Sequence, residues 1–228
     1  MDKKVLVVAA HTDDEALGCA GTIGRHISDG DQVHLLFMTN GIDSRMLKAQ
    51  EQRQSQEEID RLDVAERAAE VMGVASFTNL RFPDNRMDSV PLLDIVKEIE
   101  NKIDELQPET IYTHHIGDLN IDHQITHKAV ITACRPQPGF CVKEILTFEV
   151  LSSTEWSTPN FRSFSPSVYI DITDFVDLKK IILGIYSEEM RAPPHSRSID
   201  NAIRLNALRG SSVGMNYAEA YELIRLLR

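Results

Sequence analysis

The stretch that decides the fold is residues 6–15, which read Leu-Val-Val-Ala-Ala-His-Thr-Asp-Asp-Glu. An uninterrupted apolar run of this kind is typical of a strand that is buried in a parallel sheet. The run stops at His11, so the polar side chains that follow should lie at the carboxyl end of that strand. Ligands of open α/β sheets bind at this edge. The stretch therefore predicts a parallel sheet with a functional site directly after its first strand.

Apolar runs and helical patterns alternate along the chain, which predicts a right-handed wound, parallel sheet. The expected strands cover residues 5–10, 32–39, 76–80, 110–113, 143–149 and 167–172. The expected helices cover residues 15–28, 48–72, 92–106, a segment ending at Cys134, 178–190 and 199–208. The pattern is less regular after Pro136. We predict a single α/β domain over residues 1–228, Rossmann-like with three layers and a mostly parallel sheet, with an irregular C-terminal extension.

Composition and charge narrow the class of protein. The chain has 228 residues, is 42% hydrophobic and carries a net charge of −11. The negative charge argues against nucleic acid or an anionic membrane as the main partner. No stretch approaches the roughly 18 apolar residues of a membrane span, and residues 1–10 do not resemble a signal peptide. Three cysteines without metal spacing favour reduced packing residues, so a cytoplasmic protein is expected.

A second polar cluster follows the strand expected at 110–113 and runs from His114 to His123. In a parallel sheet both clusters lie at one edge, so they can meet although about a hundred residues separate them. A catalytic zinc site typically has three protein ligands and one open position. His11, Asp14 and one histidine of the second cluster would make such a set. We choose His123, because it begins a helix and directly follows Asp122, a candidate for orienting its ring.

This ligand set indicates a reaction class. Zinc lowers the pKa of a bound water to about 7 and polarises a carbonyl. Asp13 lies between the two expected ligands of the first cluster and is left to act as a base. Acids at a helix N-terminus also serve as caps, which needs no metal, but the second cluster favours the metal site. The sequence thus predicts metal-assisted hydrolysis of an amide or an ester.

At these residues the chain resembles the LmbE-like, or PIG-L, family of zinc-dependent de-N-acetylases. The family motif Ala-His-Pro-Asp-Asp-Glu stands here as Ala10–Glu15, with Thr12 in place of the proline, and the second motif appears as Asp122-His123. Arg61 and the loop Phe82–Asn85 resemble further family positions. Later segments resemble a bacterial branch associated with sugars and surface polysaccharides: Leu151–Trp156, Pro194–Ser198, Arg209–Ser211 and Tyr217–Ala220. The resemblance implies three zinc ligands and one general base, namely His11, Asp14 and His123, with Asp13 as the base.

The chain departs from the family pattern at one position that matters for catalysis. Many members carry a histidine that helps to stabilise the oxyanion, and this position is Asn120 here. An asparagine amide can donate a hydrogen bond to an oxyanion, but it carries no charge. The candidates for this task are therefore Asn120, His115 and His195. Asp118 is a candidate for orienting one of the histidines or for capping a turn.

The resemblance implies a small-molecule substrate, an N-acetylated amino sugar that is free, nucleotide-linked or part of a glycoconjugate. Candidate substrate-binding residues are Arg45, Arg61, Asp84 and Arg197. For each arginine taken singly, a surface ion pair is the favoured explanation. The expected metal is Zn²⁺, and Fe²⁺ suits a site with two histidines and a carboxylate as well. Relatives are often oligomeric, which makes a homo-oligomer an expectation.

Two other functions stay open at this point. A signalling receiver domain also places paired acids after its first strand to bind Mg²⁺, but His11 is a poor ligand for that ion. A catalytically idle sugar-binding relative would keep the fold, and Asn120 is the residue that favours this alternative.

Overall fold

The computed structural model describes residues 2–39 and 51–228, with side chains described outside 51–60. In this part of the chain a seven-stranded sheet has the order β3-β2-β1-β4-β5-β7-β6. The strands β1 to β5 pair with one another in parallel, whereas β7 is antiparallel to both β5 and β6. The strands are β1 Lys4–Ala9, β2 Gln32–Thr39, β3 Ser76–Phe82, β4 Thr110–His114, β5 Glu144–Phe148, β6 Val168–Asp171 and β7 Ala218–Leu226.

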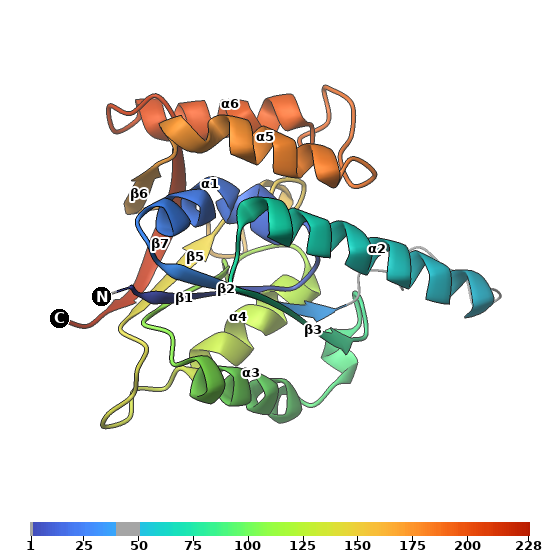
Figure 1. The fold of residues 1–228 in the computed structure, drawn as a ribbon, viewed down its shortest axis with the longest axis vertical. Coiled ribbons are helices and arrows are strands. Elements are labelled where there is room, and N and C mark those ends of the chain that lie inside the picture. Colours follow the sequence, from blue (N-terminus) through green and yellow to red (C-terminus); the bar gives the residue numbers. More distant parts are fainter. Residues whose placement is uncertain (1, 40–50) are drawn as a thin grey trace.

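Helices cover both faces of the sheet (Figure 1). One face carries α3 and α4, and the other carries α1 and α2, with α5 and α6 packed outside α1 and beside β7. The helices are α1 Asp14–Ser28, α2 Glu51–Met72, α3 Leu92–Leu106, α4 Ile121–Ala133, α5 Val176–Ile185 and α6 Ile199–Ser211. None of these helices is both long and apolar enough to cross a membrane within the described residues.

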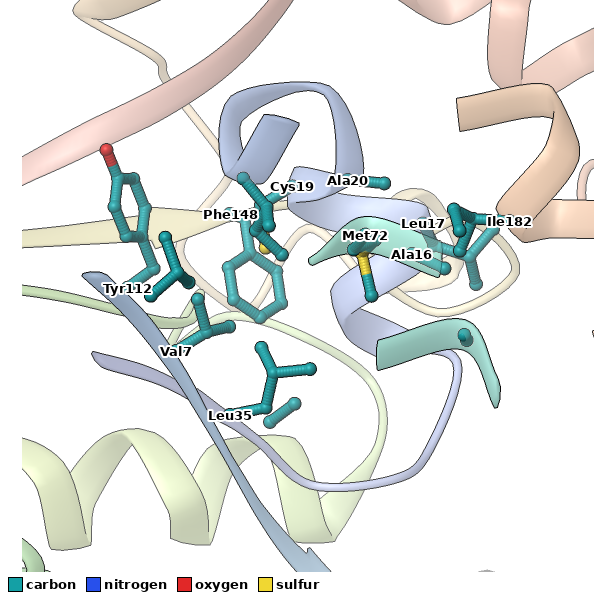
Figure 2. Close-up of a cluster of buried hydrophobic side chains, with 14 of the residues drawn as sticks. Val7, Ala16, Leu17, Cys19, Ala20, Leu35, Met72, Tyr112, Phe148 and Ile182 are labelled. Atoms are coloured by element: carbon teal, nitrogen blue, oxygen red, sulfur yellow. The ribbon is translucent and has the colours of Figure 1, made fainter. Parts of the chain in front are cut away.

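The core lies on both sides of β1, as the apolar run in the sequence predicts. Val5 and Val7 belong to the cluster under α1 and α2, whereas Leu6 and Val8 belong to the cluster under α3 and α4. Figure 2 shows the first cluster, where side chains of β1, β2, α1 and α2 meet Phe148 of β5. Fully burying one such side chain contributes about 1.5–3 kcal/mol. The central strand therefore holds the two layers of helices together through alternate residues.

The predicted α/β class with a mostly parallel sheet is confirmed, while the C-terminal part is more regular than expected. Residues after Pro136 provide β5, β6, β7, α5 and α6 to the same architecture. Strand β7 was not predicted from the sequence, because its alanines and glutamates favour a helix. Pairing with two neighbouring strands overrides this local preference. The expected helix 178–190 ends already at Ile185.

Helix α1 is interrupted, and a buried ion pair bridges the interruption. The backbone leaves helical geometry at Cys19. Beyond it, the Glu219 carboxylate of β7 accepts the backbone N–H groups of Gly21 and Thr22 at 3.1 and 2.7 Å. Lys179 of α5 binds Glu219 and donates to the Leu17 carbonyl oxygen at 2.8 Å. The pair thus satisfies backbone groups on both sides of the break, as helix ends require.

Candidate active site

Three side chains that are far apart in the sequence meet at the carboxyl ends of β1 and β4. His11 follows β1, Asp14 begins α1, and His123 lies in the first turn of α4. His11 Nδ1 is 3.2 Å from both Asp14 Oδ2 and His123 Nε2. His123 Nε2 is 3.3 Å from Asp14 Oδ2. The structure therefore brings together the three residues that the sequence predicts as metal ligands.

The chemistry and spacing of these atoms fit a divalent cation. Zinc bound tetrahedrally at about 2.0–2.1 Å keeps neighbouring ligand atoms about 3.3 Å apart, close to the spacing in this cluster. The second carboxylate oxygen of Asp14 is buried and has no hydrogen-bond partner among the described residues. Two imidazoles and a carboxylate are a donor set for Zn²⁺ and for Fe²⁺.

The outer nitrogen of each histidine faces a carboxylate. His11 Nε2 lies 3.3 Å from Asp122 Oδ2 and 3.1 Å from Asp84 Oδ1. His123 Nδ1 lies 3.1 Å from Asp118 Oδ1. Carboxylates in this position fix the rings of histidine ligands. We expected Asp122 to orient His123, but it faces His11, because adjacent residues of a helix point about 100° apart.

Asp84 and Asp122 also form a second set of metal-capable atoms with His11 Nε2. The Asp122 carboxylate already accepts the backbone N–H groups of Asn85 at 2.6 Å and Met87 at 3.1 Å. These bonds fasten the loop after β3 to α4. Asp122 therefore has the surroundings of an orienting residue for His11.

The charges in the cluster attract a cation. Burial lowers the pKa of His11, but the hydrogen bonds that its ring donates to Asp122 and Asp14 outweigh this effect and hold that pKa well above its usual value. Burial lowers the pKa of His123 too, and the Asp14 and Asp118 carboxylates raise it to about 9. The carboxylates thus favour positive charge at the imidazoles, and a metal ion would supply such a charge at the same place.

The Asp13 carboxylate has a different partner from the Asp14 carboxylate, although the two residues are adjacent in the sequence. Asp13 is only 3% exposed, and its Oδ2 accepts a hydrogen bond from Arg197 Nη1 at 2.9 Å. Burial raises its pKa to about 6, against the lowering effect of the Arg197 charge. A carboxylate with such a pKa beside a metal site is suited to accepting and returning a proton near neutral pH.

A cleft of about 510 Å³, open to solvent, lies over these groups. It is lined by His11, Thr12, Asp13, Arg61, Asp84, Asn85, Asn120, His123, Ser152, Ser153, Glu189 and Arg197. Each of these described side chains is polar. An Arg61–Glu189 ion pair links α2 to the segment after α5. Such a lining suits a ligand that carries many hydroxyl groups and little apolar surface.

Comparisons with known proteins identify the family. A family model described as "PIG-L: GlcNAc-PI de-N-acetylase" matches residues 6–134. The chain belongs to the PIG-L family. This confirms the resemblance on which the sequence analysis relied.

The PIG-L chain is similar to curated proteins that are named as deacetylases. It is 27% identical over 177 residues to the uncharacterized deacetylase YaiS of Escherichia coli K12, covering 75% of this chain and 83% of that protein. It is 26% identical over 154 residues to 1D-myo-inositol 2-acetamido-2-deoxy-alpha-D-glucopyranoside deacetylase of Geodermatophilus obscurus. That match covers 58% of this chain and about half, 52%, of the relative.

Solved structures share the PIG-L fold along the whole chain. N,N'-diacetylchitobiose deacetylase of Pyrococcus horikoshii superposes with a TM-score of 0.78 at 18% identity, covering 98% of this chain and 84% of that one. GalB of Pseudomonas putida KT2440, a 4-carboxy-2-hydroxymuconate hydratase, has a TM-score of 0.73 at 22% identity, with coverages of 99% and 98%. At these identities the likeness shows the fold alone, and a fold can carry more than one activity.

Two of the residues predicted for oxyanion stabilisation do not line the cleft of this PIG-L protein. His115 is fully buried, with Nδ1 bonded to Glu222 at 2.8 Å and Nε2 to the Arg162 carbonyl oxygen at 2.7 Å. His195 accepts the Arg197 backbone N–H through Nδ1 at 3.0 Å, and its ring packs against the half-exposed Trp156. The partners of these two rings are far along the chain, so the sequence does not show that the rings are engaged outside the cleft.

Asn120 does line the cleft, but part of its amide has a structural task. Its Oδ1 caps α4 by accepting the backbone N–H groups of Asp122 at 2.8 Å and His123 at 3.4 Å. Its Nδ2 donates to Asn85 Oδ1 at 3.0 Å. The predicted substrate residues Arg61, Asp84 and Arg197 line the cleft too. Arg45 falls outside the described residues.

Other residues at the site escaped the sequence analysis. The buried ring of His114 stacks on His123 with centroids 3.9 Å apart and accepts the Ala10 backbone N–H at 2.8 Å. Alternation along β4 could have separated His114 from His115, since successive side chains point to opposite faces. Ser152, Ser153 and Glu189 reach the cleft from irregular segments, where no periodic pattern marks them.

Proposed function

We propose that this PIG-L protein is a metal-dependent hydrolase that removes the N-acetyl group from an amino sugar. The observation that carries the proposal is the His11–Asp14–His123 cluster, with ligand atoms 3.2–3.3 Å apart, beside the buried carboxylate of Asp13. The names of two curated relatives and of a solved structure with the same fold support deacetylation. Two of these names specify an acetylated amino sugar.

In this proposal His11, Asp14 and His123 hold Zn²⁺ or Fe²⁺, and Asp13 moves the proton. The bound metal would lower the pKa of a water molecule and polarise the amide carbonyl. Asp13 accepts a proton from the attacking water while the new C–O bond forms. It then returns the proton to the amide nitrogen as the C–N bond breaks, which yields acetate and the free amine. Arg197 holds the Asp13 carboxylate in place through the bond at 2.9 Å.

Asn120 is the proposed donor to the oxyanion. Of the three residues predicted for this task, it alone lines the cleft. An asparagine amide carries two N–H donors, and the bond to Asn85 uses one of them. The other can stabilise the charge that develops on the carbonyl oxygen, as donors in oxyanion holes do.

The polar lining favours a short acyl group on a hydroxylated substrate. A long acyl chain needs an apolar surface, and among the described residues that line the cleft none offers a purely hydrocarbon side chain. An acetyl group needs little apolar contact, because it is small. Arg61, Asp84 and Asn85 provide hydrogen-bonding groups for sugar hydroxyls. We therefore propose acetylated rather than long-chain acylated amino sugars as the substrates.

A catalytically idle sugar-binding protein is the second candidate, and the capping role of Asn120 favours it. The receiver-domain alternative loses support, because Asp13 binds Arg197 whereas Asp14 lies between His11 and His123. A receiver needs its paired acids to share one Mg²⁺ ion.

The deciding experiment combines metal analysis with amine release. The purified protein is incubated with N-acetylglucosamine and N-acetylgalactosamine, free, nucleotide-linked and as glycosides, and the primary amine is quantified. We expect about one zinc or iron per chain, as a three-ligand catalytic site holds one ion, and amine release from at least one sugar. Metal and sugar binding without amine release would favour the idle protein. A parallel incubation contains an unsaturated carboxylic acid. Water addition to this acid, without amine release from any sugar, would favour hydratase chemistry.

A further inference from the structure

Asp13 has a backbone conformation that must be held by its surroundings. Its φ is 115°, a region that residues with a Cβ rarely adopt. Residues held in such conformations cluster at functional sites and persist only when neighbouring contacts determine them. The conformation matters here because Asp13 directly precedes α1, where the adjacent carboxylates of Asp13 and Asp14 lie in different surroundings.

A buried hydrogen-bonded pair provides this contact. The Asp13 backbone N–H donates to Glu15 Oε2 at 3.0 Å. The Tyr186 hydroxyl donates to the other oxygen, Glu15 Oε1, at 2.7 Å. Glu15 is fully buried and Tyr186 is 3% exposed. Within the described residues Glu15 forms no salt bridge, and it does not line the cleft.

The segment after α5 therefore reaches Asp13 at two points. Tyr186 follows the last residue of α5 and acts on the Asp13 backbone through Glu15. Arg197, eleven positions further along the chain, binds the Asp13 carboxylate directly. Both residues lie beyond 6–134, the range that the family model matches.

We propose that Glu15 and Tyr186 are positioning residues for the general base. They hold Asp13 in its left-handed conformation, so that its carboxylate faces the cleft and Arg197 while the Asp14 carboxylate faces the histidines. Neither residue touches substrate. The assignment of Asp13 as the base rests on the proposed function, whereas the effect on its conformation does not.

Three variants separate hydrogen bonding from charge and packing. Glu15→Gln keeps an oxygen that accepts the Asp13 N–H, and its amide can donate to the Tyr186 oxygen. Glu15→Met has a similar size without a strong acceptor, and Tyr186→Phe removes only the hydroxyl. Tyr221→Phe is the matched control, because its buried hydroxyl donates to Glu219 at 3.2 Å, away from the cleft.

We expect kcat to fall in the variants that weaken or lose the hydrogen bond between the Asp13 N–H and residue 15, and to fall most where no acceptor remains. Glu15→Met should lower kcat about 10- to 100-fold, the effect of moving a catalytic group by about 1 Å, with KM and metal content unchanged. Glu15→Gln should stay near the wild type, Tyr186→Phe should fall between these two, and Tyr221→Phe should keep full kcat. An unchanged kcat in Glu15→Met, or an equal loss in Glu15→Gln, would overturn the proposal.

A structural readout makes the test independent of activity. In crystal structures of the metal-loaded variants, φ of Asp13 should stay positive in Glu15→Gln and leave that region in Glu15→Met. If Glu15→Met does not fold, a faster hydrogen exchange of the Asp13 amide in Tyr186→Phe is the expected result, and unchanged exchange overturns the proposal. If the wild type releases no amine, the proposed function fails, while these two measurements still decide the role of Glu15 and Tyr186.

Discussion

Asp13 and Asp14 are adjacent after the end of β1, but their surroundings suit the two carboxylates to different chemical roles. Burial raises the pKa of Asp14, but the charges of His123 and His114 and the hydrogen bond from His11 hold that pKa well below its usual value. Asp13 faces Arg197 at 2.9 Å, and burial dominates its pKa. One acid is therefore suited to binding a cation and the other to exchanging a proton.

Replacing Asp13 should abolish turnover without loss of the metal. Asn has the same shape but cannot take a proton from water, so Asp13→Asn should lower kcat by about 10²- to 10⁴-fold. Amine release and metal content measured on the same sample check this. Asp29→Asn, at the exposed end of α1, serves as the control and should behave like the wild type. Full activity of Asp13→Asn would show that another group is the base.

The carboxylates behind the histidines should tune metal affinity. Asp122→Asn and Asp118→Asn should each weaken metal binding about 10- to 100-fold, because the rings of His11 and His123 lose the acceptors that orient them. Competition with a chelator of known affinity measures the Kd. Asp31→Asn is the matched control, since Asp31 faces His26 at 2.7 Å far from the site. Equal affinity in all three variants would contradict the orienting role.

At the scale of elements, α1 shows how closely the layers pack. A Cβ at Gly18 would lie 2.5 Å from the Phe148 ring of β5, so this glycine permits the close approach of α1 to the sheet. A Cβ at Gly21 or Gly24 would instead meet Ile172 or Leu178, at or near α5. Gly18 thus permits contact with the sheet, whereas Gly21 and Gly24 permit contact with the outer layer. The sequence contains the spacing, but the partner of each glycine depends on the tertiary fold.

A methyl group at this contact should destabilise the protein. Gly21→Ala places Cβ 2.7 Å from Ile172 Cβ, and such overpacking costs about 1–3 kcal/mol in the free energy of unfolding. Gly184→Ala in α5 is the control, because its Cβ meets open space and should stabilise the helix by about 0.5–1 kcal/mol. Urea unfolding measures both. Equal stability of Gly21→Ala and Gly184→Ala would refute the close contact.

At the scale of the whole molecule, the cleft unites distant parts of the chain. The candidate metal ligands come from residues 11–123, while Ser152, Glu189 and Arg197 close the cleft from the C-terminal part. Strands of both parts also share one sheet. We expect the chain to unfold in one transition, since neither part has a sheet of its own.

Metal removal should therefore lower the stability of the whole protein. A ligand that binds only the folded state stabilises it by about 2.7 kcal/mol at a free concentration of 100 times Kd. Chelation should lower the Tm of the wild type, and added Zn²⁺ should restore it. His123→Ala should show no response to either treatment, because it lacks a ligand. An equal response of wild type and variant would place the metal elsewhere.

The sequence by itself predicted the three candidate metal ligands and the edge of the sheet on which they lie. The apolar run that ends at His11 and the histidine-rich cluster that ends at His123 were sufficient, because parallel strands bring their carboxyl ends together. Strand alternation and capping patterns are local, so they can be read without knowing the contacts made across the fold.

Only the tertiary structure decided which groups face one another. His115 and Asn120 look equally suited in the sequence, yet contacts with Glu222 and Arg162 turn His115 away from the cleft. Strand β7 and the pairing of Arg197 with Asp13 also stayed hidden. The physical reason is that side-chain direction and long-range pairing depend on neighbours that are close in space and far along the chain.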